Sequence, residues 1–174
     1  MARYLIERTP NPTGTIYEIY SEERTVVSKV AGDCTFPGCR LTFSAPDCCI
    51  VTFIRTDSLE FTFEDLSGRI CGYVREAKFS TTGKSIVENG SHGVIGSVKS
   101  GFRSKMTVFS DKEETLAIVY RNPDRKIPFL LWPAEAHLLK RYVLETVSDT
   151  PLDSRLFFCV VCLLVGDEWQ SSSS

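Results

Sequence analysis

The fold is decided near the C-terminus by the stretch Thr150-Pro151-Leu152-Asp153-Ser154-Arg155-Leu156-Phe157-Phe158-Cys159-Val160-Val161-Cys162-Leu163-Leu164-Val165-Gly166. Thr150 can cap a helix, Pro151 suits its first position and Asp153 its first turn. Gly166 can adopt the left-handed conformation that ends a helix. The stretch predicts a helix over about 151–165, roughly 22 Å long at 1.5 Å per residue. A buried strand is the competing interpretation, because Val and Phe also favour strands.

The ten residues from Leu156 to Val165 are all apolar. A helix that is apolar on every side must be surrounded by protein, and in a β-rich chain a closed barrel does this. A membrane span needs about 20 such residues, so we expect the helix inside the protein. Its expected core residues are Leu156, Phe157, Phe158, Val160, Val161, Leu163 and Leu164.

The chain upstream alternates apolar and polar residues at period two, as in half-buried antiparallel strands. Three units repeat about every 45 residues, each an apolar strand, a short acidic turn and a second strand, which predicts hairpins over 17–30, 61–74 and 107–120. Further strands are expected at Cys49–Arg55 and Val94–Lys99. Stretches rich in Gly, Pro and Ser predict connections at 9–14, 31–39, 44–47, 81–93 and 121–133.

The composition indicates one globular domain: 174 residues, 43% hydrophobic and 24% charged, with a net charge of −2. The charge excludes a generally basic nucleic-acid binder. Seven cysteines at irregular spacing predict reduced thiols, and the N-terminal residues lack the apolar run of a secretory signal. These features predict a cytoplasmic or nuclear protein.

The closing stretch Tyr142-Val143-Leu144-Glu145-Thr146-Val147-Ser148-Asp149, followed by the apolar helix, resembles the tubby C-terminal-like group. This group contains tubby proteins, phospholipid scramblases and LURP-one-related proteins. The resemblance implies a mainly β fold: a closed antiparallel barrel of about twelve strands around the C-terminal hydrophobic helix. It covers residues 1–169 as one domain, with 170–174 as a disordered tail. An ordinary β-sandwich with a C-terminal strand is the alternative.

Enzymatic motifs are missing from the sequence. It has no nucleophile elbow, phosphate-binding Gly-Lys-Ser/Thr loop or His-Glu-x-x-His motif, and its two histidines are His92 and His137. The spacing of Cys34, Cys39 and Cys48-Cys49 is poor for zinc, and a calcium site before the helix would have only Asp149 and Asp153. We expect no catalytic residue, no metal and no cofactor.

Lipid binding is the sharpest functional hypothesis, because tubby proteins bind phosphoinositide headgroups with basic side chains. Residues 99–126 carry seven basic and four acidic side chains. Their formal net charge is therefore +3, whereas that of the rest of the chain is −5. The loop Lys99-Ser100-Gly101-Phe102-Arg103-Ser104-Lys105 is the best patch, and Arg121, Arg125 and Lys126 form a second. The competing interpretation is that these are ordinary solvated charges beside strands.

The expected function is therefore non-enzymatic recognition of anionic phospholipid headgroups by a monomer that binds membranes peripherally. A protein-interaction module of the LURP-one-related type, with contacts through residues 31–47 or 121–137, is the alternative. A phospholipid scramblase ranks lower, because it would require the central helix to leave the barrel.

Overall fold

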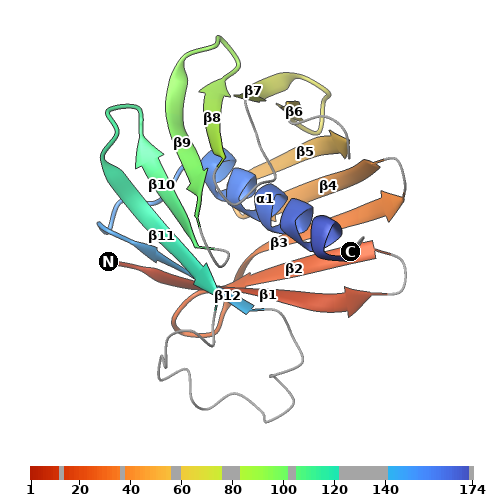
Figure 1. Cartoon of the computed structure of the whole chain (residues 1–174), viewed down its shortest axis with the longest axis horizontal. Coiled ribbons are helices and arrows are strands. Elements are labelled where there is room, and N and C mark those ends of the chain that lie inside the picture. The colour runs from red at the N-terminus through yellow and green to blue at the C-terminus, as the bar shows by residue number, and fades with distance from the viewer. Residues whose placement is uncertain are drawn as a thin grey trace.

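The computed structural model describes residues 1–11, 14–35, 38–55, 60–75, 83–101, 105–121 and 141–172. Its elements are β1 (Arg3–Asn11), β2 (Gly14–Tyr20), β3 (Val26–Thr35), β4 (Gly38–Ala45), β5 (Cys48–Arg55), β6 (Phe61–Glu64), β7 (Ile70–Arg75), β8 (Lys84–Asn89), β9 (Val94–Ser100), β10 (Met106–Ser110), β11 (Thr115–Arg121), β12 (Arg141–Thr146) and α1 (Ser154–Ser172). The strands form a closed antiparallel barrel in the order β1-β12-β11-β10-β9-β8-β7-β6-β5-β4-β3-β2, with α1 running through the ring (Figure 1). The predicted barrel around a C-terminal helix is confirmed, and the β-sandwich alternative is wrong.

The central helix supplies the middle of the core. Phe158 lies between two inward-facing rings of the wall, with ring centroids 5.3 Å from Phe43 and 5.4 Å from Phe63. The seven helix residues predicted as core are all buried. Burying each such side chain stabilises the fold by about 1.5–3 kcal/mol, so the barrel and the helix depend on each other.

Two glycines let the helix approach the wall closely. A Cβ atom at Gly96 would lie 3.1 Å from Leu156 and 2.3 Å from the carbonyl oxygen of Phe109. One at Gly72 would lie 3.2 Å from Cδ of Arg155. A larger residue at either position would push the wall or the helix outward.

The helix begins and ends later than the sequence predicted. Asp153, not Thr150, is the cap: its Oδ1 accepts the backbone N–H of Arg155 at 2.9 Å, and its carbonyl accepts that of Phe157 at 3.0 Å. The Arg155 guanidinium also holds Asp153, which fixes the start there. Gly166 is buried within α1, where packing outweighs its cost of about 1 kcal/mol. Residues 170–172 of the predicted tail are helical, and 173–174 lie outside the described residues.

The three predicted hairpins are confirmed as β2–β3, β6–β7 and β10–β11, and β8–β9 is a fourth of the same kind. In three of the four turns the first side chain accepts backbone N–H groups two and four positions later; these residues are Asp65, Asn89 and Ser110. The fourth residue of each turn has a positive φ; these residues are Arg24 (62°), Gly68 (81°), His92 (65°) and Glu113 (65°). Each turn therefore bends the chain sharply and adds the bulge seen in each pairing register.

Several predicted connections are strands. Residues 84–89 form β8 within the predicted connection 81–93, and the connection 31–39 contains the end of β3 and the start of β4. β1 extends into 9–14 and β4 into 44–47. Gly and Ser are tolerated here because these strands pair on both sides within a closed sheet. Of the predicted connection 121–133, residues 122–133 lie outside the described residues.

The prediction that all cysteines are reduced is wrong for Cys39, which is disulfide-bonded. The register places the backbone of Cys34 directly opposite Cys39 on β3 and β4, a proximity that sequence spacing alone did not reveal. Cys48, Cys49, Cys71, Cys159 and Cys162 are free. The prediction of a cytoplasmic or nuclear protein relied in part on all cysteines being reduced. A disulfide at Cys39 removes that part of the argument, because disulfides are rare in reducing compartments.

Candidate functional site

A ligand of this barrel would have to bind outside it or at one of its ends, because α1 fills the interior. The helix residues from Phe158 to Leu164 are fully buried against the wall. Among the described residues, no helix is both long enough and apolar enough to span a bilayer. The surface residues predicted from the sequence are therefore the first candidates.

Two of the predicted lipid-binding residues lie together on the outer face of the barrel. Lys99 is exposed on β9 and faces Thr107 of β10 in register. Lys105 is exposed two positions before Thr107, on the same face of the sheet, so it is a diagonal neighbour of Lys99. The backbone N–H of Gly101 donates to the carbonyl of Lys105 at 2.6 Å and holds the two strands together there.

The structure adds Lys84, which the sequence had placed in a connection. Lys84 begins β8 and stands directly opposite Lys99 in the β8–β9 register. Directly opposed side chains in a sheet have Cβ atoms about 4.5–5.5 Å apart, so the two ammonium groups can converge on one anion. Lys84, Lys99 and Lys105 form what we term the lysine row. The β-branched pair Ile86-Val87, which follows Lys84 and Ser85, was the sequence signal for this strand.

The lysine row already holds one anion of the protein itself. The carboxylate of Glu113, in the turn between β10 and β11, forms an ion pair with Lys84. Lys84, through a hydrogen bond and its charge, and more weakly Lys99, keep the pKa of Glu113 below its usual value. The outer face at Lys84 and Lys99 is therefore a place where an anion is stabilised.

The remaining predicted residues do not join this row. Arg121 is exposed at the end of β11, but alternation puts it on the same face as Ala117 and Val119, which point into the barrel. It is also separated from β9 by β10. Arg103, Arg125 and Lys126 lie outside the described residues.

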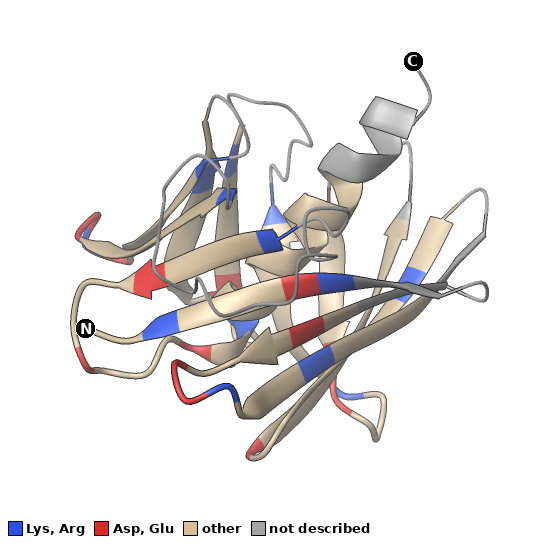
Figure 2. Ribbon diagram, turned by 90° about the horizontal axis from the view of Figure 1, so that it is seen from below, with Lys and Arg blue, Asp and Glu red and all other residues tan. Residues whose placement is uncertain are grey.

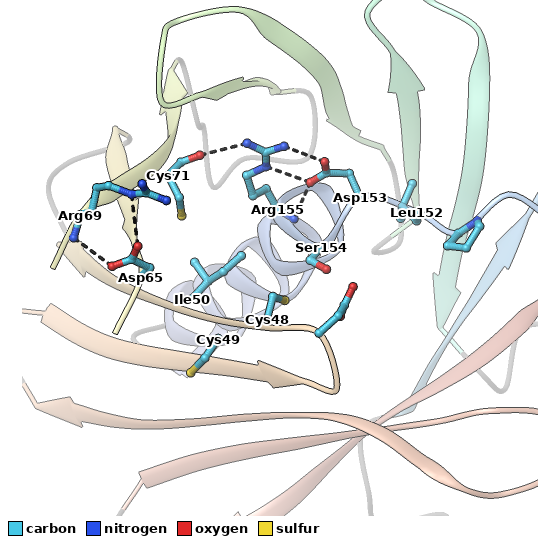
Figure 3. A pocket seen from close by; sticks show the side chains of 12 residues that line it. Cys48, Cys49, Ile50, Asp65, Arg69, Cys71, Leu152, Asp153, Ser154 and Arg155 are labelled. Atoms are coloured by element: carbon cyan, nitrogen blue, oxygen red, sulfur yellow. Dashed lines mark hydrogen bonds and ion pairs between the residues drawn. The ribbon is translucent and has the colours of Figure 1, made fainter. Parts of the chain in front are cut away.

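A cavity of about 570 Å³ opens where α1 begins (Figure 3). Its lining comes from the β4–β5 turn, the β6–β7 hairpin and the start of the helix: Asp47, Cys48, Cys49, Ile50, Asp65, Arg69, Cys71, Pro151, Leu152, Asp153, Ser154 and Arg155. Arg155 bridges it, since its guanidinium donates to Asp153 at 2.8 Å and to the carbonyl of Cys71 at 3.0 Å. Of the three acidic residues in the lining, two form ion pairs within it: Asp153 with Arg155 and Asp65 with Arg69.

Two thiols of this cavity, those of Cys48 and Cys71, are poorly suited to nucleophilic chemistry. Burial raises the pKa of Cys48 although Ser154 hydrogen-bonds to it, and burial raises the pKa of Cys71 although Arg155 opposes this. The thiolate is the reactive form, so both are held in the inert one. In the helix, burial raises the pKa of Cys159 to about 12 and that of Cys162 well above its usual value. These two thiols are core residues, as predicted.

His92 takes part in a surface cluster with Tyr73 and Glu88. Its ring stacks on Tyr73 with centroids 4.2 Å apart, and its Nδ1 lies 3.2 Å from the carboxylate of Glu88. Glu88 is 2% exposed and also pairs with Arg75. These contacts hold the β8–β9 turn against the outer face of β7 and β8. His137 lies outside the described residues, among which no three His, Cys, Asp or Glu side chains are grouped to hold a metal ion.

Charge is unevenly distributed between the two ends of the barrel. One end of the barrel, which we term the turn end, is formed by residues 21–25, 46–47, 65–69, 90–93, 111–114 and 147–153. These segments contain nine acidic residues and three basic ones, and the tight turns of Figure 2 accordingly carry much red. The lysine row lies toward the opposite end, where β8 begins and β9 finishes.

Comparison of the chain with protein-family models, with curated proteins and with solved structures found no match.

Proposed function

We propose that this chain is a non-enzymatic binding domain of the tubby-like type that recognises anionic phospholipid headgroups, phosphoinositides above all, through the lysine row. The observation that carries the proposal is the direct opposition of Lys84 and Lys99 on the outer face of β8 and β9. Like charges in this position destabilise a sheet unless an anion lies between them. A phosphomonoester, with a charge of about −1.5 to −2, is well matched to two ammonium groups.

Further support comes from where the row lies. The acidic turn end would be repelled by an anionic surface, whereas the row lies toward the opposite end of the strands, although Glu113 of the turn end pairs with Lys84. Of the described residues, Lys84, Lys99 and Lys105 would face a membrane approached from that side. Each basic residue close to an anionic bilayer contributes about 1 kcal/mol, so three of them give weak, reversible and peripheral attachment.

Vesicle co-sedimentation with matched variants tests this proposal. We expect Lys99→Gln to weaken binding to vesicles containing phosphatidylinositol bisphosphate about fivefold, and Lys84→Gln with Lys99→Gln about thirtyfold, at about 1 kcal/mol per residue. Lys112→Gln is the control, because it removes the same charge from the exposed turn 111–114. If Lys112→Gln weakens binding as much as Lys99→Gln does, the lysine row is not the binding site.

A further inference from the structure

Exposed apolar side chains gather at the turn end. The described part of the chain has seven large hydrophobic residues that are strongly exposed, and six of them lie at this end: Met1, Val26, Leu66, Ile70, Val94 and Val147. Phe53 is the exception, and a Cβ atom at Gly38 would meet its ring, so it covers β4. Single exposed apolar residues are ordinary, but their concentration at one end marks an interaction surface.

Three of these residues lie on two neighbouring hairpins, one of which contributes to the cavity lining. Leu66, 76% exposed, lies in the turn of β6–β7, and Ile70, 41% exposed, follows that turn, whose Asp65 and Arg69 line the cavity. Val94, 46% exposed, begins β9 on the next hairpin, which is joined to the first through the β7–β8 pairing. A concave opening with exposed apolar side chains on the neighbouring hairpins suits the anchoring side chain of a partner.

The charge of this end defines its partner further. Its connecting segments hold nine acidic and three basic side chains. In the cavity, Asp65 and Asp153 are paired with arginines, but Asp47 is exposed and has no ion-pair partner among the described side chains. A complementary ligand therefore carries positive charge together with apolar side chains.

We propose that the turn end docks a basic amphipathic segment of another protein, with its apolar side chains on Leu66, Ile70 and Val94 and a Lys or Arg side chain at the cavity mouth facing Asp47. The surface is distinct from the lysine row and does not depend on the lipid proposal. With both surfaces in use, the barrel would link a basic protein segment to an anionic membrane.

The test uses the full chain and a fluorescein-labelled model peptide, Leu-Lys-Lys-Leu-Leu-Lys-Leu repeated twice. We expect binding by fluorescence anisotropy without lipid, weakened at least tenfold by Leu66→Ser with Val94→Ser and at least fivefold by Asp47→Lys. Lys99→Gln is the control at the lysine row and should leave binding within twofold. Amide shifts on titration should concentrate in residues 47–48, 65–70, 90–94 and 147–153.

Two further peptides separate docking from simple charge attraction. A peptide of the same composition, scrambled so that no helical face is apolar, should bind at least tenfold more weakly, and one with Glu in place of Lys should not bind. The proposal is overturned if the chain fails to bind the first peptide, if the scrambled peptide binds equally well, or if the serine variants bind unchanged.

Discussion

Lys84 and Lys99 face each other across β8 and β9, and the carboxylate of Glu113 reaches Lys84 from the turn that joins β10 to β11. Glu113 adopts a positive φ of 65° at that turn. Most residues other than Gly, Asn and Asp rarely adopt a positive φ. At this position it directs the side chain of Glu113 toward Lys84 and Lys99. An external anion that binds Lys84 competes with this carboxylate.

Glu113→Gln should therefore tighten binding to anionic vesicles. Removing the competing charge leaves Lys84 available to the lipid, and exposed ion pairs of this kind are weak, so we expect a gain of about two- to fivefold. Co-sedimentation at fixed ionic strength measures it. Glu114→Gln is the control, since it changes the net charge equally in the same turn. An equal gain in both variants would show that overall charge, not the Lys84 contact, is responsible.

Gly96→Ala should destabilise the barrel. The added Cβ would meet the carbonyl oxygen of Phe109 at 2.3 Å, a backbone atom that cannot move without shifting β10. Overpacking of this kind costs about 1–3 kcal/mol in the free energy of unfolding, measurable by urea denaturation. Ser148→Ala, at an exposed position, should stay within about 0.5 kcal/mol. A Gly96→Ala protein as stable as the wild type would mean that the wall and helix are less tightly packed than described.

Asp153→Ala should remove a pH-dependent part of the stability. Burial alone would raise the pKa of Asp153, but hydrogen bonds from the side chain and backbone of Arg155 outweigh it and lower the pKa. A lowered folded-state pKa stabilises the protein above the unfolded value of about 3.9, and this contribution is lost as the pH falls through the folded-state pKa.

The loss of this helix cap should cost about 1 kcal/mol at pH 7, and the difference from wild type should shrink as the pH falls below about 4. Urea unfolding of both proteins at pH 7 and pH 3 measures it. A difference that stays constant over this range would show that the Asp153 carboxylate does not provide the stabilisation.

Val161→Asp should prevent folding. Val161 is fully buried in the middle of α1, and an unpaired carboxylate there costs several kcal/mol. Circular dichroism and the yield of monomeric protein report the loss. Val147→Asp places the same charge on a residue that is 58% exposed and should fold normally. A folded Val161→Asp protein would contradict the position of the helix inside the barrel.

The sequence predicted the architecture because the strongest patterns lie in the core. The apolar run at Leu156–Val165 required enclosure, and the repeated acidic turns marked three hairpins correctly. The helix ends were less predictable. Whether Thr150 or Asp153 caps the helix depends on Arg155, whose guanidinium also reaches the carbonyl of Cys71 on a distant strand.

The candidate site was only partly accessible from sequence. Lys99 and Lys105 stood out as a local cluster, but Lys84 is adjacent only through strand register. The competing role of Glu113 likewise depends on a turn that folds back over the outer face of the sheet. Contacts between residues this far apart in the chain follow from the closed sheet and not from local spacing.

The most direct test of the central claim is the affinity of the wild-type chain for vesicles with and without phosphatidylinositol bisphosphate, measured across a salt series without calcium. We expect binding that requires the anionic lipid, persists near 0.15 M salt and weakens as added salt screens the lysine row. Failure to bind these vesicles even at low salt would contradict a lipid-binding function for this barrel.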